Sequence, residues 1–437
     1  MRLAAWLLAL AAARGQAEGN PEQVLERARA KFQAMAHDLS RYACIETVER
    51  QYFQPVLDTK AEALAEAPAA SCDAVKANPH QPQKLESTDR LRLEVTVSEG
   101  REIYSWPGAT RFDSRDVDEI IREGPIGTGS FGTHLLGIFD NPGVQFRFAG
   151  RQTVEQREIL EYSFHVGLEA SRYRVKAGAA WRAIAYSGSF WLDAQSLELR
   201  RLTVRADEVP RETSICELNA ALDYGRVHIG DGEALLPRQG QLQISLASGR
   251  QTNNLTTFAD CREYQAESAV SFEEGGDVKS APSRTTVRAP LAIPLGLPVT
   301  LALAAGIDTD SAAAGDPVSA KVVKAVRRPG TDEVLIPAGA TVRGRVTRVE
   351  HHILPTPYFL VAISFNRLVI QDTTAPFAAR SERKPELEKE LGANRLVQGR
   401  GLGFWGVGTF LFPTAKSHYV MPAGYETKWI TLAIRGR

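Results

Sequence analysis

Neither sign of charge is in excess in this 437-residue sequence, in which 52 Lys and Arg residues balance 52 Asp and Glu residues. Proteins that wrap nucleic acid or hold anionic membranes by electrostatics need a surplus of cationic side chains, so the balance argues against both classes. Beyond the N-terminus, no apolar run approaches the roughly 20 residues that a membrane-spanning helix requires. We therefore expect a mature protein that binds no nucleic acid and has no transmembrane segment.

The N-terminus has the layout of a secretory signal peptide. Arg2 is followed by the apolar run Leu3–Ala13, and a short exit segment with small residues ends at Ala17. The apolar run is too short to span a bilayer, and polar residues follow at once. We predict that residues 1–17 are removed by cleavage near Ala17 and that the protein is secreted or periplasmic.

Cysteine is scarce, with four residues, and export changes how these four are interpreted. They are Cys44, Cys72, Cys216 and Cys261. Thiols meet an oxidising environment outside the cytoplasm, and four cysteines allow three disulfide connectivities. We favour Cys44 with Cys72 and Cys216 with Cys261, because each pair lies within one local stretch of strands and loops. Zinc is the alternative, but no two cysteines have the close spacing of zinc ligands.

One helix and many alternating segments follow the signal. Asn20 and Pro21 are good first residues for a helix, and apolar residues then recur at three- and four-residue spacing over Glu22–Leu39. Strict alternation predicts antiparallel strands with one buried face. It occurs over residues 91–97, 144–148, 160–166, 216–224 and 242–246. We expect a short helix over Ser114–Glu123, with Ser114 as its N-cap.

Composition divides the chain into two parts. Residues 274–298 are rich in Gly, Ser and Pro, as a linker is. From the end of this linker onward, the motif Pro-x-Gly recurs at Pro294, Pro337 and Pro422, each time before a strand-like run. A fixed Pro and a permissive Gly suit the tight corners of a small closed barrel. The charged stretch Ala379–Gly392 is expected to be a helical or mobile insertion.

The predicted fold class is therefore mainly β. An antiparallel half-barrel with an N-terminal amphipathic helix should occupy residues 18–273, and a second small β-barrel domain should occupy residues 299–437.

The first of these regions resembles a known fold. The residues that carry the likeness are the helix Glu22–Leu39, the strand Tyr42–Tyr52, and the hairpin from Ser189–Asp193 to Leu199–Leu202. Together they resemble the periplasmic lipoprotein-carrier (LolA-like) half-barrel, in which a helix lies in the mouth of an open sheet. The region is also similar to uncharacterised secreted bacterial proteins that share the segments Ile103–Trp106 and Gly127–Gly132. The resemblance implies a hydrophobic ligand or a lipoprotein as partner.

The second region resembles another family. Its segments Ile307–Asp310, Ala314–Val318 and Leu335–Ala340 are similar to the TrbI-like barrel of conjugation and type IV secretion channel proteins. That barrel oligomerises in the cell envelope. The resemblance implies that the C-terminal barrel docks to an envelope partner or to copies of itself.

Candidate catalytic and cofactor motifs are weak. Gly127, Gly129 and Gly132 spell GxGxxG, but a dinucleotide site needs a parallel strand before this motif and a helix after it. We therefore interpret the motif as a flexible surface loop. The adjacent His351 and His352 would face opposite sides of a strand and could not share a metal ion. We predict a protein without cofactor or resident metal that is not an enzyme.

Aromatic residues supply the candidate binding surface. On a half-barrel they would line the concave face, where an apolar stripe either packs under the helix or binds a hydrophobic ligand. The candidate hydrophobic-ligand face consists of Phe32, Met35, Tyr104, Trp106, Phe146, Phe148, Tyr162 and Phe164. The preferred function is non-catalytic binding of a lipidic ligand or lipoprotein segment. The alternatives are an envelope assembly module whose half-barrel is filled by its own side chains, and an envelope hydrolase with a site assembled in space.

Overall fold

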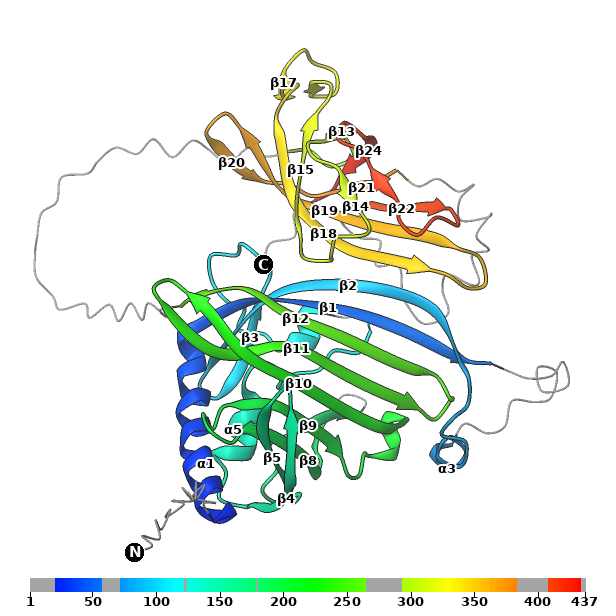
Figure 1. The fold of residues 1–437 in the computed structure, drawn as a ribbon. Helices are drawn as coiled ribbons and strands as arrows, with labels where there is room; N and C mark the ends of the chain where they lie inside the picture. The colour runs from blue at the N-terminus through cyan, green and yellow to red at the C-terminus, as the bar shows by residue number, and fades with distance from the viewer. Residues whose placement is uncertain are drawn as a thin grey trace, which may run out of the picture.

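The computed structural model describes residues 20–56, 71–121, 124–177, 180–264, 293–382 and 408–433. The predicted signal peptide and most of the predicted linker lie outside these ranges. As predicted, the fold is mainly β, with antiparallel sheets and an N-terminal helix. A half-barrel forms one part of the molecule and a smaller barrel forms the other (Figure 1).

Ten antiparallel strands build the half-barrel in the spatial order β4-β5-β8-β9-β10-β11-β12-β1-β2-β3. Their bounds are β1 Tyr42–Pro55, β2 Gln83–Ser98, β3 Arg101–Ser105, β4 Val144–Val154, β5 Arg157–Val166, β8 Tyr186–Asp193, β9 Leu199–Ala206, β10 Ile215–Ile229, β11 Gly232–Leu246 and β12 Gln251–Glu263. A separate hairpin pairs β6 (Arg174–Ala177) with β7 (Ala180–Ala183). The alternation predicted the inner face of β2 correctly, since residues 91, 93, 95 and 97 are all buried. It was wrong for the other face near the end of the strand, where Glu94 and Thr96 are buried as well.

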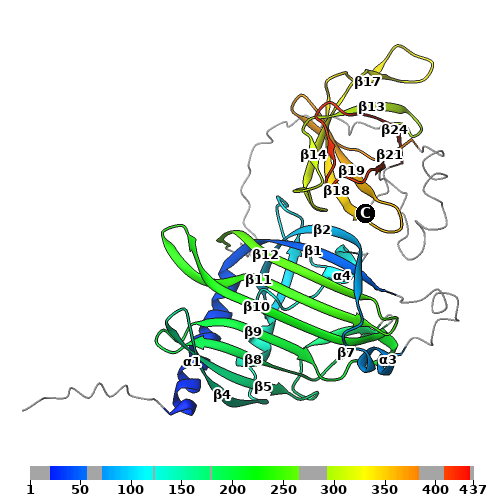
Figure 2. The ribbon, with the colours of Figure 1, turned by 45° about the vertical axis from the view of Figure 1, so that its right-hand side comes forward.

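Helix α1 (Pro21–Asp38) crosses the strands on the concave side of the sheet (Figure 2). The predicted start of the helix is confirmed, because the side chain of Asn20 accepts a hydrogen bond from the N–H of Glu22. A 3₁₀ turn, η1 (Leu39–Arg41), leads from α1 into β1. A second helix, α5 (Thr133–Phe139), packs against α1 inside the half-barrel. Two layers thus form, one of helices and one of sheet.

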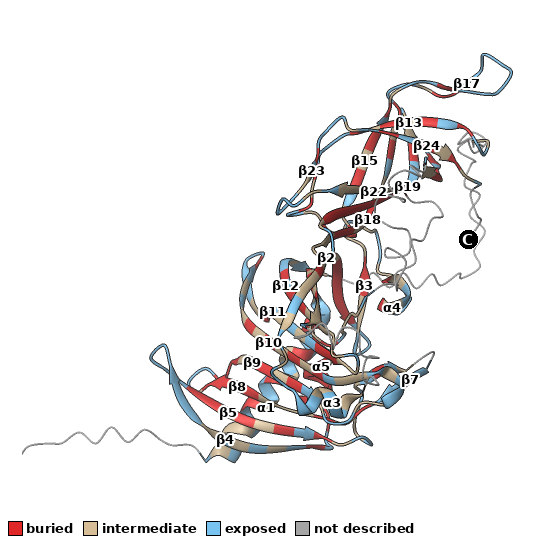
Figure 3. Ribbon diagram, turned by 90° about the vertical axis from the view of Figure 1, so that its right-hand side faces the viewer, coloured by how far each residue is buried: buried red, intermediate tan, exposed pale blue. Residues whose placement is uncertain are grey.

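Aromatic side chains fill the space between α1, α5 and the sheet. The ring centroid of Phe32 on α1 lies 4.8 Å from that of Phe139 on α5, and Phe139 lies 5.1 Å from Phe190 on β8. Tyr162 on β5 stacks on Phe190 at 5.3 Å. Along strands such as β5 and β9, buried residues alternate with more exposed ones (Figure 3).

Three shorter helical segments remain, of which one was predicted with other bounds and two were not predicted. The helix predicted over Ser114–Glu123 is wrong in extent: α4 spans Val117–Ile120, and its N-cap is Asp116. Helix α3 (Cys72–Ala77) interrupts a long connection between β1 and β2. A further 3₁₀ turn, η2, spans Arg211–Thr213.

The second part is a small barrel with its own core. The ring runs β24-β13-β15-β18-β19, and β20 and β21, consecutive in the chain, connect β19 back to β24. The strand bounds are β13 Pro298–Leu303, β14 Ile307–Asp308, β15 Pro317–Val322, β16 Val326–Arg327, β17 Val334–Ile336, β18 Thr341–His352, β19 Tyr358–Ile370, β20 Thr373–Pro376, β21 Ala379–Ser381, β22 Gly408–Pro413, β23 Val420–Met421 and β24 Glu426–Thr431.

The repeated corners were predicted correctly. Gly296, Gly339 and Gly424 have φ values of 83°, 82° and 78°, in the left-handed region that glycine tolerates best. Each stands shortly before a barrel strand, namely β13, β18 and β24. The expectation of an insertion from Ala379 is wrong at its start, because Ala379–Ser381 pairs with β24 as a strand; residues 383–392 lie outside the described ranges.

The two parts share one continuous sheet. Ser87, Thr88 and Asp89 of β2 pair with residues 350–352 of β18. Beside this pairing, the loop that precedes β15 lies along β2, where Arg92 and Asp316 form an ion pair at 2.5 Å. Residues 314–318, one of the segments on which the expected TrbI-like resemblance rests, therefore contact the half-barrel of the same chain.

All four cysteines form disulfides, but the predicted pairing is wrong. The bonds are Cys44 with Cys261 and Cys72 with Cys216. Strands β1 and β12 are neighbours, with Ala43 opposite Arg262, so Cys44 and Cys261 meet across the sheet. Helix α3 packs beside β10 and brings Cys72 to Cys216. Proximity in sequence was a poor guide, because the sheet order joins distant strands.

Candidate functional site

A groove of about 280 Å³ runs between α1 and the β10–β11 hairpin. We call it the α1 groove. Its apolar lining consists of Phe32, Ala34, Met35, Leu39, Tyr42, Ala234, Leu235 and Leu236, and its charged lining consists of Lys31, Asp38, Glu198, Arg226 and Glu233. An apolar floor with a charged rim suits an amphiphilic ligand.

Polar contacts place α1 beside this groove. The side chains of Arg29 and Gln33 donate to the carbonyl oxygen of Phe139 at the end of α5. From the same helix, the Nζ of Lys31 donates to the carbonyl oxygen of Ser196 at 2.8 Å. The helix is therefore held at one side by α5 and at the other by the β8–β9 turn.

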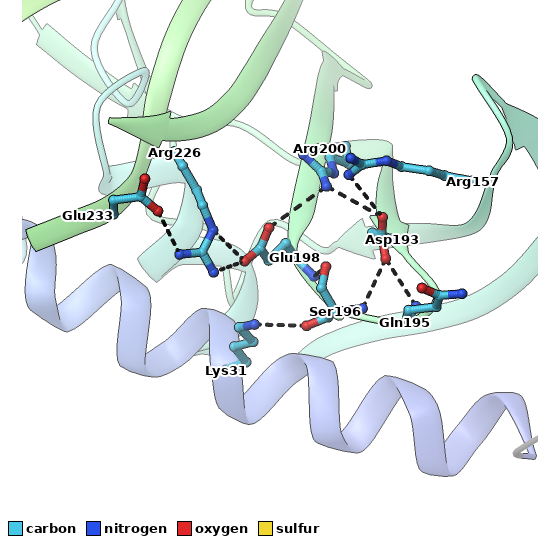
Figure 4. Close-up of polar contacts among 9 residues, drawn as sticks. All are labelled: Lys31, Arg157, Asp193, Gln195, Ser196, Glu198, Arg200, Arg226 and Glu233. Carbon is cyan, nitrogen blue, oxygen red and sulfur yellow. Dashed lines mark hydrogen bonds and ion pairs between the residues drawn. The ribbon is translucent and has the colours of Figure 1, made fainter. Parts of the chain in front are cut away.

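A row of six charges of alternating sign follows the strand ends along α1 (Figure 4). We call it the charge row; its members are Glu233, Arg226, Glu198, Arg200, Asp193 and Arg157. Successive N–O distances are 3.2, 2.5, 3.8, 3.4 and 3.7 Å. The residues come from the neighbouring strands β11, β10, β9, β8 and β5 and the turn between β8 and β9, so the sheet order brings together what the sequence separates.

The turn between β8 and β9 fixes the centre of the charge row. The carboxylate of Asp193 accepts hydrogen bonds from the N–H groups of Gln195 and Ser196. Burial would raise the pKa of Asp193, but these two hydrogen bonds and the nearby Arg200 outweigh burial and lower it below its usual value. Asp193 is therefore ionised at neutral pH and holds the guanidinium groups on either side of it.

The two central carboxylates of the charge row lie deeper than the arginines around them, whereas Glu233 at its end is half exposed. The carboxylates of Asp193 and Glu198 are 8% and 6% exposed, whereas the side chains of Arg157, Arg226 and Arg200 are 62%, 57% and 31% exposed. A second cavity of about 410 Å³, the charged pocket, is lined by these five residues together with Gln156, Glu158, Gln195 and Ser196. Glu198 and Arg226 line both the charged pocket and the α1 groove, so they form the wall between the two.

The residues predicted for the ligand face are distributed over several places. Phe32 and Met35 line the α1 groove. Tyr104, Tyr162 and Phe164 are buried in the half-barrel core, and Phe146 and Phe148 pack at its margin. Trp106 lies beside Gly315, where the barrel meets the half-barrel. Their role in ligand binding stays a prediction.

Sequence reasoning missed most of the groove. Leu235 and Leu236 follow the turn at Gly232 but were not singled out, and the charge row went unnoticed because its members are far apart in sequence. The available signal is the position of Asp193 at the end of the first strand of the predicted hairpin Ser189–Asp193 to Leu199–Leu202.

The GxGxxG loop is not the flexible surface loop that we expected. The carboxylate of Glu102 accepts hydrogen bonds from the N–H groups of Gly129, Phe131 and Gly132, and Phe131 is 1% exposed inside the half-barrel. Backbone N–H groups of such a loop would cradle a phosphate in a nucleotide site. Here a carboxylate of the same chain occupies them.

Two more titratable side chains lie in the same interior. Burial, with a contribution from Glu102, raises the pKa of Glu46 to about 8. Burial lowers the pKa of His134 to about 4, so its ring is neutral at physiological pH. Within the described ranges, Oε2 of Glu46 and the hydroxyl of Tyr224 have no hydrogen-bond partner. These groups belong to the packed interior, apart from the α1 groove.

The described part of the chain has neither a cluster of metal ligands nor a membrane-spanning helix. It contains no group of three His, Cys, Asp or Glu side chains placed to hold a metal ion. His351 stacks on Phe359 and His352 stacks on Tyr358, so the two rings are separately engaged. Among the helices described, none is long and apolar enough to cross a bilayer.

Comparison with known proteins gives similarities of fold. No family model matches the sequence, and neither does any curated protein. Among solved structures, the chain is similar to an outer membrane lipoprotein-sorting protein domain from Vibrio parahaemolyticus, with 10% identity and a TM-score of 0.28 over 56% of this chain and 94% of that one. It is also similar to a DUF1329 family protein from Desulfovibrio piger, with 10% identity and a TM-score of 0.26 over 58% and 96%.

Proposed function

We propose that this protein is an exported, non-catalytic binding protein whose α1 groove takes the hydrocarbon chain of a lipid or of a lipid-modified protein. The observation that carries the proposal is the apolar floor of the groove, made by Met35 of α1 and Leu235 and Leu236 of β11. The two disulfides are consistent with an oxidising compartment outside the cytoplasm. The C-terminal barrel would dock to an envelope partner.

Helix α1 is the part that would move. It buries three residues, Ala28, Phe32 and Ala36, whereas α5 buries every residue of His134–Phe139. Burying a large apolar side chain contributes about 1.5–3 kcal/mol, so displacing α1 costs far less than displacing α5. The groove is slightly smaller than the roughly 300–1,000 Å³ of typical ligand sites. A modest shift of α1 would lengthen it over Phe139 and Phe190.

Binding of a fluorescent fatty acid, 11-(dansylamino)undecanoic acid, tests the proposal. We expect the dansyl emission of the probe to rise and shift to shorter wavelength with the full-length protein. Leu235→Glu, which places a charge on the apolar floor, should weaken binding at least tenfold. Leu255→Glu is the matched control, because Leu255 is 38% exposed on the outward face of β12. Failure of the wild-type protein to bind the probe, or equal weakening by both variants, would contradict the proposal.

A second function is favoured by a different observation. Phe32, Phe139, Phe190 and Tyr162 fill much of the concave face. A half-barrel filled in this way suits an assembly module of the envelope that carries no small ligand. Native mass spectrometry of protein purified from its own envelope fraction distinguishes the two, since a bound lipid mass is expected for the carrier and none for the module.

A further inference from the structure

The charged pocket and the α1 groove adjoin, and each offers what the other lacks. The groove has an apolar floor, and the pocket has charged walls. Arg226 and Glu198, which Figure 4 draws, belong to both linings. A molecule in the groove that extends past this pair would enter the pocket. A ligand that fills both spaces has a hydrocarbon chain at one end and a polar head at the other.

The arrangement of charge by depth indicates the sign of that head. Asp193 and Glu198 are buried, and their carboxylates form ion pairs with the more exposed Arg157, Arg200 and Arg226. Arg200 faces both carboxylates with Nη2, and Arg157 faces Asp193 with Nη1. The remaining N–H groups of these two guanidinium groups are hydrogen-bond donors at the exposed side of the pocket. The total charge of the row is balanced, and the third carboxylate of the pocket, the half-exposed Glu158, forms an ion pair with Arg151 outside the lining. The donors available to a ligand are therefore those of Arg157 and Arg200.

We propose that the charged pocket binds the phosphate of a single-chain amphiphile whose hydrocarbon chain lies in the α1 groove. Arg157 and Arg200 donate hydrogen bonds to the phosphate oxygens, a geometry for which guanidinium groups are well suited. Asp193 is a positioning residue, because it fixes both arginines without touching the ligand. This inference rests on the proposed function, since it assigns the head group to a chain that the groove must first accept.

Competition against the dansyl fatty acid tests the inference. The competitors are dodecyl phosphate, dodecyl maltoside and dodecyltrimethylammonium, each below its micellar concentration, and inorganic phosphate alone. We expect dodecyl phosphate to displace the probe at a concentration at least tenfold lower than the other two detergents. Inorganic phosphate should not displace it, because the chain supplies much of the affinity.

A pair of double variants locates the effect. Arg157→Ala with Arg200→Ala should reduce the preference for dodecyl phosphate about tenfold while leaving the affinity for dodecyl maltoside unchanged. Arg147→Ala with Arg205→Ala is the matched control, because it removes two exposed arginines from the outward face of the same sheet. It should leave the preference intact. Thermal unfolding of all variants checks that they fold.

The outcomes separate this inference from the proposed function. Equal competition by the three detergents in the wild-type protein, or a preference that survives removal of Arg157 and Arg200, overturns the phosphate assignment and leaves the groove proposal in place. Displacement by inorganic phosphate as strong as that by dodecyl phosphate would identify a site for free phosphate and overturn the amphiphile. If the probe itself does not bind, the proposed function fails, and this inference fails with it.

Discussion

Glu46 lies on the inner face of β1, 3% exposed, in a region where most neighbours are apolar. Burial and, less strongly, Glu102 raise the pKa of Glu46. Burial, together with Glu102 and Glu46, also raises the pKa of the Tyr104 hydroxyl. A carboxyl group with a pKa of about 8 is protonated at neutral pH and carries no net charge in the interior. The interior of the half-barrel therefore tolerates this residue through a bound proton.

This proton makes stability depend on pH in a definite direction. The folded state keeps the proton up to about pH 8, whereas the unfolded chain loses it near 4.5, so the free energy of unfolding falls as pH rises between these values. His134 acts oppositely: its pKa drops from 6.5 to about 4, so stability rises with pH in that interval. Between about pH 4.5 and 6.5 the two effects on the free energy of unfolding oppose one another. A net fall in the free energy of unfolding should therefore appear between pH 6.5 and 8.

Glu46→Gln should remove the fall. The difference in unfolding free energy between the variant and the wild type should change by about 2–4 kcal/mol in favour of the variant from pH 5 to pH 9. The reason is that the wild type loses the stabilising proton in this range, whereas a neutral amide does not titrate. Urea denaturation at both pH values measures this gain. Glu49→Gln, on the outward side of the same strand, is the control, and its difference from the wild type should be the same at both pH values. A pH-independent difference for Glu46→Gln would show that Glu46 does not hold the proton.

At the scale of elements, the two disulfides join parts of the half-barrel that are packed to different extents. Helix α3 buries none of its residues, so its bond from Cys72 to Cys216 is its main attachment to the half-barrel. Cys44 is fully buried between β1 and its neighbouring strands. One bond therefore restrains a peripheral helix, and the other lies within the sheet.

Replacing Cys72 and Cys216 with Ala should release α3 while the half-barrel stays folded. The bond spans 144 residues, so its loss should cost at most about 5 kcal/mol by chain entropy. Hydrogen exchange should accelerate over Cys72–Ala77 and stay unchanged in β1 and β12. Peptide mapping of the wild-type protein without reductant checks the premise, and recovery of a peptide joining Cys44 to Cys72 would refute it.

Local features were predictable from the sequence, and pairings between distant strands were not. The start of α1, the alternation in β2 and the three glycine corners depend on neighbouring residues, so their patterns are visible in the chain. The charge row and the disulfides depend on which strands are adjacent, and alternation does not encode that order. Part of the groove lining can therefore be named from the sequence, such as Phe32 and Met35 on α1, while the lining on β11 is missed.

At the scale of the whole molecule, Gly315 is the tightest point of the junction. Its φ is +109°, and a Cβ added there would lie 2.2 Å from the carbonyl oxygen of Arg92 and 2.9 Å from the ring of Trp106. The backbone beside it is paired, since the N–H of Arg92 donates to the carbonyl oxygen of Ala314 and the N–H of Ala314 donates to that of Arg90. Any side chain at this position must push the barrel away from β2.

Gly315→Ala should therefore weaken the junction by about 2–4 kcal/mol, through overpacking added to backbone strain. Calorimetry should show the barrel and the half-barrel unfolding in more separated transitions than in the wild type. Gly330→Ala is the control, because Gly330 also has a positive φ of 76° but would place its Cβ in open space. Similar traces for both variants would mean that the junction does not couple the two parts.

The bond between Cys44 and Cys261 has one more consequence for the molecule as a whole. It links the first and last strands of the half-barrel across 217 residues, so the polypeptide between them is a covalent ring. A protease that cuts once in any turn of that ring opens it but releases no fragment, and every strand remains tethered to the rest. In a compartment exposed to proteases, a nicked half-barrel could then keep its shape until the disulfide itself is reduced.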